Sequence, residues 1–486
     1  MVSNLNSKII NAAKWSTITS TISKLITPIT TMILARILTP EAFGVIATVT
    51  MIISFADMFA DAGFQKYLIQ QDFKNNKIKF RYANVAFWTN LTISFLIWLL
   101  ISIFSEQIAT FAGNPGLGKV IVIAGISLPL TSFSSIQMAL YRRSFDFKTL
   151  FYVKLFGICI PFFVTIPLAL YGLSYWSIII GTICGSLSNA IILTIKSEWK
   201  PTAFYSFMML KKMFSFSFWS LLETISIWFT SWVDIFIISS LLNSYYLGIY
   251  KTSINMVNGI LGLVAGSIAT VLFSALSRLK DNENSFNETL FKFQKYVSIF
   301  LLPMGVGIFI YRDTITYILL GSQWAEASLL IGLWGLINSS SIVFSYLSSE
   351  VYRSKGLPKI SLLAQLLHII AIIPTCYISM KYGFNTLVIA RSLIGLQFVL
   401  VHFLLLYMIF KISPLKMIKN IFPIIFCSAL MGLFAELIQM VSNKIYWNVV
   451  SIGLCIVFYF MIILLIPSIR MEIFEVLKKK SQKLNL

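Results

Sequence analysis

The sequence predicts an all-α integral membrane protein with about fourteen transmembrane helices. Of its 486 residues, 58% are hydrophobic and only 12% are charged, and the mean hydropathy is +0.84. Soluble globular domains carry about 25% charged residues, so a soluble fold is excluded. Apolar windows of roughly 20 residues, the length that crosses a bilayer as a helix, occur at 14–38, 41–64, 82–104, 118–140, 149–170, 174–195, 214–241, 246–276, 292–311, 327–350, 359–380, 385–410, 419–440 and 447–467.

The placement of charge predicts the orientation of these helices. A net charge of +20 would favour nucleic-acid binding in a soluble protein. Here most of the 38 Lys and Arg residues fall on one side of the predicted spans, the side that also carries both termini. The positive-inside rule therefore predicts cytoplasmic termini, and no nucleic-acid partner is needed to explain the charge. The predicted cytoplasmic loops are 65–81, 141–148, 196–212, 278–292, 351–359 and 411–419.

The cysteines give no sign of a disulfide framework or a metal site. All five lie inside predicted spans without a paired spacing: Cys159, Cys184, Cys376, Cys427 and Cys455. We therefore interpret them as packing residues and expect no metal. The first span lacks the short apolar region and small-residue cleavage site of a signal peptide, so we expect it to stay in the membrane.

The first span carries a polar stripe on one helical face. The stripe consists of Thr17, Ser20, Lys24, Thr27 and Thr31. An ammonium that faced lipid at the depth of Lys24 would cost at least about 2.5–3.5 kcal/mol, so this cation needs a partner or water. Pro28 removes the N–H that would bond to the Lys24 carbonyl, which predicts a kink there. We expect Lys24 to line a cavity for an anion; a salt-bridged or snorkelling lysine is the alternative.

The second span has clear start signals and an acidic end. Thr39 can cap the helix, with Pro40 at its first position and Glu41 in its first turn. Asp57 and Asp61 share a face near the opposite, cytoplasmic end. We expect neighbouring lysines to pair with these carboxylates, and a role in ion coupling is the alternative.

An internal repeat divides the chain. A shift of 204 residues places Trp15-Ser16 on Trp219-Ser220 and Gly44 on Gly248. Each repeat would hold six spans, so both copies have the same orientation, as in transporters whose halves are related by an axis along the membrane normal. We expect an N-lobe at 1–200 and a C-lobe at 201–411, related by pseudo-two-fold symmetry. Two further helices and a basic tail occupy 412–486.

The spans that begin the second repeat are also polar. The eighth carries Lys251, Asn255 and Asn258 on one face, which predicts a surface that meets protein or water. The seventh carries Glu223 and Asp234. These carboxylates repel anions, so we expect them either to bind a coupling proton or cation or to form static ion pairs.

The twelfth span adds one further cation. Arg391 lies near its start and shares a face with His402, and we hold a substrate contact and a structural role open. His402 and His368 are the only histidines of the chain, and both lie in apolar stretches. For both we expect a hydrogen-bonded place in the core rather than a role as a ligand or relay.

Several runs together resemble the polysaccharide-transporter branch of the multidrug/oligosaccharidyl-lipid/polysaccharide (MOP) exporter superfamily, which contains the Wzx-type flippases. These runs are LARILTPEAFGVIATVTMII, GFQKYLIQQ, YLGIY, VLFSALSRLKDNE and LLPMGVGIFIYRDTITYILLGSQWAEAS, together with Asp234. The resemblance covers about residues 10–400. The chain departs from it at IISSLLN, where many relatives have Ile-Gly-x-x-Leu-Gly, and at Lys251, which replaces a commonly small residue. These departures leave the sugar open.

The resemblance implies the MOP exporter fold and a bacterial inner-membrane location. It also implies that a polyprenyl-pyrophosphate-linked oligosaccharide crosses from the cytoplasmic to the periplasmic leaflet by alternating access, in O-antigen, capsule or exopolysaccharide synthesis. In this superfamily the first, second, seventh and eighth helices line the central cavity. A lysine suits a pyrophosphate that must later be released, so Lys24 and Lys251 are the first candidates for that contact. For Lys251, which lies near the periplasmic end of its span, the alternative is a lysine that snorkels to interfacial water. Asn255, Asn258 and Arg391 are further candidates for binding the pyrophosphate or the oligosaccharide.

A carrier of this kind has no catalytic residues and no cofactor beyond a coupling H+ or Na+. Its expected partners are the lipid-linked oligosaccharide, membrane lipid, and a polysaccharide polymerase with its chain-length machinery. Two alternative functions remain open at this point. One is a cation-coupled exporter of small molecules with the same fold, and the other is a membrane glycosyltransferase or polysaccharide polymerase. The short predicted periplasmic segments argue against an enzyme, because they leave no external domain for a catalytic site.

Overall fold

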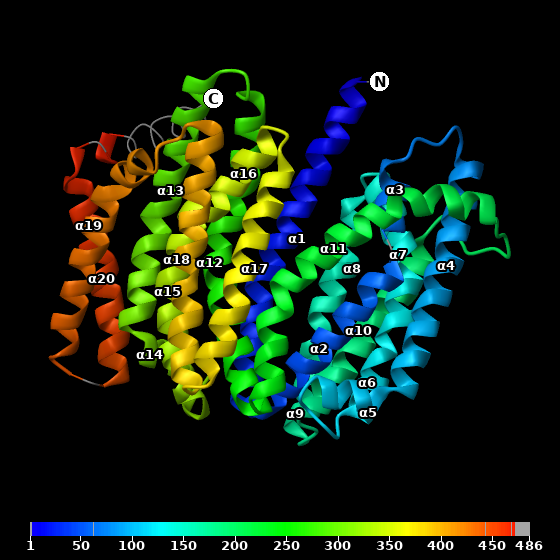
Figure 1. The fold of residues 1–486 in the computed structure, drawn as a ribbon, viewed down its shortest axis with the longest axis horizontal. Helices are drawn as coiled ribbons and strands as arrows, with labels where there is room; N and C mark the ends of the chain where they lie inside the picture. Colours follow the sequence, from blue (N-terminus) through cyan, green and yellow to red (C-terminus); the bar gives the residue numbers. More distant parts are fainter. Residues whose placement is uncertain (1, 62, 443, 468, 472–486) are drawn as a thin grey trace. The chain divides into compact units, whose positions relative to one another are not determined.

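The computed structural model describes residues 2–61, 63–442, 444–467 and 469–471, and every element in these ranges is a helix (Figure 1). Twelve helical segments of the described chain are long and apolar enough to cross a membrane. The predicted seventh and eighth spans fall on two further long helices, α11 (Phe207–Leu241) and α12 (Ser244–Arg278). The predicted all-α membrane protein is confirmed, and the two further long helices coincide with the predicted spans that these twelve segments do not include.

The chain forms two compact units, Met1–Thr252 and Ser253–Leu486. This division follows packing, and it places α11 in the first unit. The sequence repeat instead predicts lobes at 1–200 and 201–411, a boundary that stays a prediction. The first unit contains α1 (Val2–Ile37), α2 (Pro40–Asp61), α3 (Phe64–Gln70), α4 (Asn76–Ile103), α5 (Ser105–Phe111), α6 (Gly118–Gly125), α7 (Ser127–Arg143), α8 (Phe147–Ile160), η1 (Pro161–Thr165), α9 (Ile166–Leu170), α10 (Tyr175–Lys196), α11 and the start of α12.

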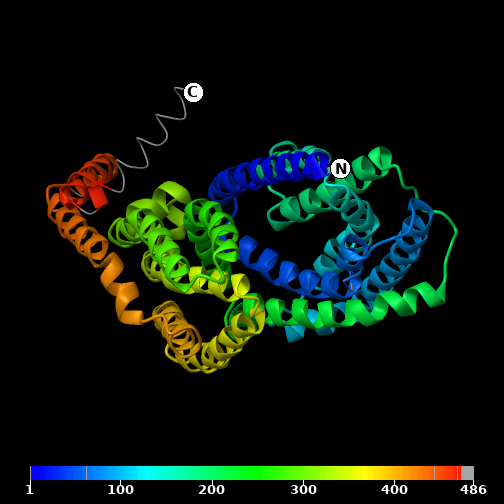
Figure 2. The same ribbon diagram turned by 90° about the horizontal axis from the view of Figure 1, so that it is seen from above.

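The second unit continues from α12 and ends with a helical hairpin. α13 packs on α15 and α19, α17 pairs with α18, and α19 lies beside α20 in both views (Figures 1 and 2). The elements are α13 (Glu283–Ile310), α14 (Arg312–Leu319), η2 (Ser322–Ala327), α15 (Ser328–Ser341), η3 (Ile342–Tyr346), α16 (Leu347–Ser354), α17 (Pro358–Met380), α18 (Phe384–Phe410), α19 (Pro414–Gln439) and α20 (Ile445–Leu465).

Local sequence explains where several helices begin. The Asn75 and Asp146 side chains accept hydrogen bonds from the N–H groups of Ile78 and Thr149, and so cap α4 and α8. Helix α2 starts at Pro40, as its start signals predict. The π-helical turn η1 begins at Pro161, whose missing N–H interrupts the regular helical hydrogen bonds.

In the first unit, residues that the internal repeat aligns contact each other reciprocally. A Cβ atom built on Gly44 would overlap the carbonyl oxygen of Ser244, and one built on Gly248 would overlap that of Pro40. Pro40 and Ser244 are separated by the same 204 residues as the two glycines. A two-fold contact pairs i with j and j with i in this way. The two equivalent helix starts therefore meet on each other, and only glycine permits this approach.

A buried polar network lies beside this contact. The Asn114 amide donates to the hydroxyl oxygens of Ser239 at 2.8 Å and Thr48 at 3.2 Å. Ser244 Oγ donates to Asn114 Oδ1 at 2.5 Å. Because these groups come from α2, α11, the start of α12 and the segment after α5, the network ties four parts of the first unit together.

Candidate functional site

The polar stripe on α1 stays accessible in the first unit. Thr17, Ser20 and Thr27 are exposed, and Lys24 and Thr31 are half-buried. Thr31 Oγ1 donates within the helix, to the carbonyl oxygen of Thr27 at 3.0 Å. That this stripe faces a water-filled cavity stays a prediction, which depends on the cost of an ammonium group in hydrocarbon.

Two further candidates lie together where α11 and α12 approach each other. Asp234 is 5% exposed, and the Tyr250 hydroxyl donates to its Oδ2 at 2.7 Å. The Lys251 ammonium lies 4.2 Å from the centroid of the Trp232 ring and interacts electrostatically with Asp234. A desolvated cation–π contact contributes about 2 kcal/mol. The structure thus holds Lys251 with an aromatic face and a nearby carboxylate.

Of the three remaining predicted carboxylates, the structure describes the side chain of Asp57 alone. Asp57 is half-buried on α2 and lines a cavity of about 200 Å³ together with Ser54, Thr131 and Ser186. The side chains of Asp61 and Glu223 lie outside the described residues.

The second unit joins two predicted residues through one that the sequence did not single out. Trp334 Nε1 donates to Asn258 Oδ1 at 3.0 Å, and the Arg391 guanidinium lies 4.9 Å from the centroid of the Trp334 ring. Asn338 Nδ2 also donates to Asn258 Oδ1, at 2.8 Å. Arg391 is only 8% exposed, whereas Asn258 is exposed. We call Asn258, Trp334, Asn338 and Arg391 the amide–indole cluster.

Asn255 is exposed one turn before Asn258 and makes none of the cluster's hydrogen bonds. Trp334 and Asn338 were missed because Trp is common in spans and a single Asn stands out little. Their spacing of four residues in the middle of an apolar span, which puts them on one face, was the available signal.

Both histidines are buried and hydrogen-bonded, as predicted. His368 Nδ1 lies 2.9 Å from Gln397 Oε1, and His402 Nδ1 lies 3.0 Å from the Tyr352 hydroxyl. Phe398 packs between the two imidazole rings, with centroid distances of 4.4 and 4.5 Å. These contacts join α16, α17 and α18, which explains the histidines as packing residues.

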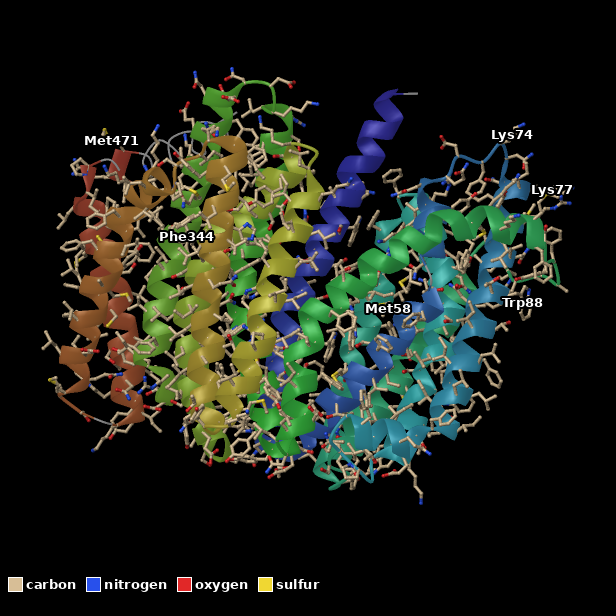
Figure 3. All side chains as sticks on the ribbon, viewed as in Figure 1. Met58, Lys74, Lys77, Trp88, Phe344 and Met471 are labelled. Atoms are coloured by element: carbon tan, nitrogen blue, oxygen red, sulfur yellow. The ribbon has the colours of Figure 1, made fainter. Side chains whose placement is uncertain are left out.

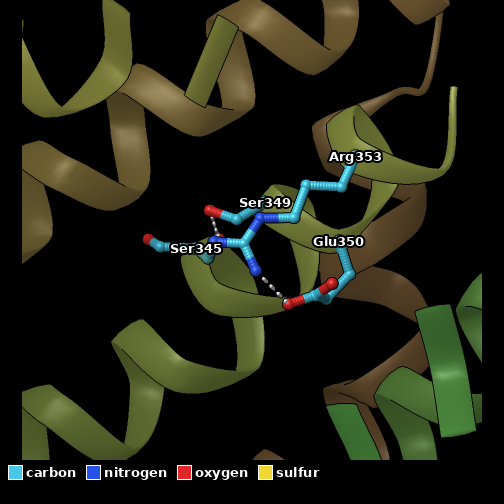
Figure 4. Close-up of polar contacts among 4 residues, drawn as sticks. All are labelled: Ser345, Ser349, Glu350 and Arg353. Carbon is cyan, nitrogen blue, oxygen red and sulfur yellow. Dashed lines mark hydrogen bonds and ion pairs between the residues drawn. The ribbon is translucent and has the colours of Figure 1, made fainter. Parts of the chain in front are cut away.

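Near the end of α16, Arg353 pairs with Glu350 at 3.1 Å, and Ser349 Oγ donates to the Ser345 carbonyl oxygen one turn earlier (Figure 4). The Glu350 side chain is 6% exposed and that of Arg353 is 54% exposed. The arginine therefore covers the carboxylate and keeps a buried charge paired.

The basic loops of the first unit combine cations with aromatic rings. Arg143 Nη1 donates to the Leu68, Ile69 and Gln71 carbonyl oxygens at 3.0, 2.9 and 2.6 Å, which caps the end of α3. Lys74 and Lys77 project at the same end as the start of α4 (Figure 3). Burial, together with the neighbouring Tyr82, raises the pKa of Tyr67 to about 12, so this hydroxyl stays protonated at neutral pH.

Each unit also holds one large apolar cavity, and the two occupy equivalent places. The first, of about 720 Å³, is lined by α2, α4, α5 and α11, and the second, of about 430 Å³, by α12, α13, α14, α19 and α20. Seven lining positions between Ile97 on α4 and Ala112, which follows α5, have counterparts 207 positions later that line the second cavity. They are Ile97, Leu100, Ile101, Phe104, Ile108, Phe111 and Ala112, which match Met304, Gly307, Ile308, Tyr311, Ile315, Ile318 and Leu319.

Comparison with known proteins gives a consistent family. The model of a family described as polysaccharide biosynthesis protein matches residues 33–329, more than half of the chain. A membrane protein from the cps region of Klebsiella pneumoniae is 24% identical over 379 residues, 77% of each chain. The succinoglycan biosynthesis transport protein ExoT of Rhizobium meliloti is 24% identical over 66% of this chain and 64% of its own. The lipopolysaccharide biosynthesis protein WzxC of Escherichia coli is 20% identical over 66% and 65%.

Solved structures identify the fold. The lipid II flippase MurJ, in an inward closed conformation, superposes with a TM-score of 0.77 at 17% identity, covering 92% of this chain and 98% of its own. An inward-facing MATE multidrug transporter of the MOP superfamily superposes with a TM-score of 0.57 at 12% identity, covering 84% and 98%. The predicted MOP exporter fold is confirmed.

Proposed function

This chain belongs to the polysaccharide biosynthesis protein family, and from that premise we propose that it is a flippase for polyprenyl-pyrophosphate-linked oligosaccharide repeat units. The substrate would cross the cytoplasmic membrane for the synthesis of a surface polysaccharide. The chain would act as a carrier, without covalent chemistry.

The accessible polar stripe of α1, with Lys24 at its centre, is the observation that carries this proposal. The exposed hydroxyl groups of Thr17, Ser20 and Thr27 beside a half-buried cation, halfway along a spanning helix, support a surface that meets water or a polar substrate. A pyrophosphate supplies the matching charge, and a lysine binds it as a point charge that can also release it. Lys251 would provide a second cation, which leaves the Trp232 ring when the substrate binds.

The orientation is part of the proposal. We place both termini and the basic loops in the cytoplasm, as the positive-inside rule predicts, and the reciprocal Gly44 and Gly248 contact at the periplasmic end. Pro115, exposed beside that contact, provides the test. A Pro115→Cys variant should react with a membrane-impermeant thiol reagent added to intact cells, and a reaction only after the membrane is opened would reverse the orientation.

The function itself is tested by deletion in the producing cell. Loss of a flippase should leave lipid-linked repeat units on the cytoplasmic face of the membrane. Loss of a polymerase leaves them on the outer face, and loss of a small-molecule exporter leaves none to accumulate. Accumulated repeat units that an external glycosidase digests in intact cells would contradict the proposal.

A further inference from the structure

In the amide–indole cluster of the second unit, we propose a carbohydrate-binding subsite formed by Asn258, Asn338 and Trp334, which contacts the oligosaccharide of the substrate and not its pyrophosphate. This inference rests on the proposed flippase function and adds to it the place where the sugar is recognised. The structure supports it in three steps.

The first step is that the cluster fixes the orientation of both amides. An indole N–H can only donate, so the atom of Asn258 that lies 3.0 Å from Trp334 Nε1 has to be its oxygen. That oxygen also lies 2.8 Å from the amide of Asn338, which therefore has to present its nitrogen. Neither side chain can flip without breaking a hydrogen bond. The indole thus sets both carboxamides in one arrangement.

The second step concerns what this arrangement leaves for a ligand. The Asn258 nitrogen keeps two N–H donors and the Asn338 oxygen keeps its acceptor sites, and among the described residues none of them has a hydrogen-bond partner. Asn258 is exposed and Asn338 half-buried. A sugar hydroxyl both donates and accepts, so neighbouring donor and acceptor groups match it. A pyrophosphate only accepts, and it would leave the Asn338 oxygen unmatched.

The third step is the position of the cluster in the membrane. Asn258 lies well inside α12, and Trp334 lies well inside the span Ser322–Ser354 that η2, α15, η3 and α16 form. An amide group that faced hydrocarbon at this depth would carry a free-energy cost, because its hydrogen-bonding groups would have no partner there. The exposed amides therefore indicate a surface that meets water. Arg391, buried against the indole, holds the ring in place, and an aromatic ring offers the C–H face of a sugar a stacking surface.

The experiment compares two lipids that differ only in the sugar. The probes are undecaprenyl pyrophosphate and the lipid-linked repeat unit isolated from producing cells that lack the polymerase. Both are titrated onto the full-length protein in nanodiscs, and binding is measured by native mass spectrometry. Asn258→Leu and Asn338→Leu should each weaken binding of the sugar-bearing lipid by about fivefold to tenfold, the effect of one hydrogen bond. Binding of undecaprenyl pyrophosphate should not change.

A matched control is available on the same helix. Ser340 Oγ donates only within α15, to the Leu336 carbonyl oxygen at 3.2 Å, so Ser340→Ala should leave both affinities unchanged. If a leucine variant fails to fold, Trp334→Phe carries the test. It keeps a packed ring and loses the N–H that sets both amides, and it should weaken only the sugar-bearing lipid.

Two results would overturn the inference, and they differ from failure of the proposed function. If the cluster variants weaken both lipids equally, the cluster has a structural role. If they weaken neither while the wild type binds both, the sugar is recognised elsewhere. A wild type that binds neither lipid would refute the flippase proposal itself, and the subsite with it.

Discussion

The two units contain matching apolar cavities but differ in the polar groups that they present. Both contain a cavity walled by equivalent residues of α4 and α5 or of α13 and α14. The first unit places charges at membrane depth, with Lys24, Lys251 and Asp234. The accessible side chains of the amide–indole cluster in the second unit are neutral, since its cation is buried beneath the indole. The matching cavities follow the repeat, whereas the charged site and the amide–indole cluster lie at positions that the repeat does not relate.

The apolar cavities show a second difference. A segment of α11 with Trp228, Phe229, Val233 and Phe236 completes the wall of the first cavity, whereas α19 and α20 complete the second. The C-terminal hairpin of α19 and α20 thus closes the second cavity, as α11 closes the first. This explains how two helices can be appended to a twofold repeat without lying outside the packed fold.

The largest effect is expected where the repeats meet. Gly44→Ala and Gly248→Ala would each push a Cβ against a backbone carbonyl group that cannot move aside, a form of overpacking that costs about 1–3 kcal/mol or more. We expect a several-fold loss of folded protein in the membrane, measured by fluorescence-detected chromatography. Gly185→Ala is the matched control, because its Cβ would meet open space. Equal amounts of all three variants would disprove the close contact.

The second-largest effect is expected for substitutions of Lys24, in the charged site of the first unit. Lys24→Ala should abolish export with membrane abundance near normal, and Lys24→Arg should keep part of the activity, because charge is the needed property. A lysine that served only in a buried ion pair would behave differently. Its loss would leave a carboxylate unpaired, lower stability by about 3–5 kcal/mol, and reduce export and abundance together. Export is measured beside protein level, and normal export by an abundant Lys24→Ala protein would end the anion-site hypothesis.

The coupling role of the carboxylates can be separated from a static one. If Asp234 carries a proton or cation during transport, Asp234→Asn should still bind the lipid-linked substrate but lose its dependence on the ion gradient. Tyr250→Phe removes the hydroxyl that donates to Asp234 and keeps the charge, so it should retain that dependence. Glu223→Gln is measured in parallel. Gradient dependence that persists in both amide variants would leave only the ion-pair interpretation.

The smallest effect concerns the cavities. Ala56 and Ile260 line equivalent walls, 204 positions apart. Ile260→Ala should enlarge the second cavity and lower the melting temperature by a few degrees, since Ile→Ala costs about 2–5 kcal/mol when fully buried and Ile260 is half-buried. Ala56→Ile adds volume beside the larger first cavity and should change the melting temperature less. If Ala56→Ile changed the melting temperature more than Ile260→Ala, the two cavities would not be equivalent.

The sequence by itself determined the class of the protein and most of its spans, because a helix that crosses a bilayer needs an apolar run of fixed length. It also located the polar faces of α1 and α12, since the helical period places Lys24 with its hydroxyl stripe and Asn255 with Asn258 whatever the neighbours are. The internal repeat was visible as the alignment of Gly44 with Gly248, although nothing in the sequence indicates that each touches the other's helix start.

Only the tertiary structure decided which partners these residues have. Trp232 and Asp234 meet Lys251 and Tyr250, which lie only 16 to 19 residues further along the chain. Trp334 and Asn338 reach Asn258 from more than 70 residues away, and Arg391 packs on Trp334 from another helix. Local periodicity says which face a residue occupies, and it contains no information about what packs on that face. Such contacts depend on how whole helices cross, which is set by the sum of many apolar side chains and not by any motif.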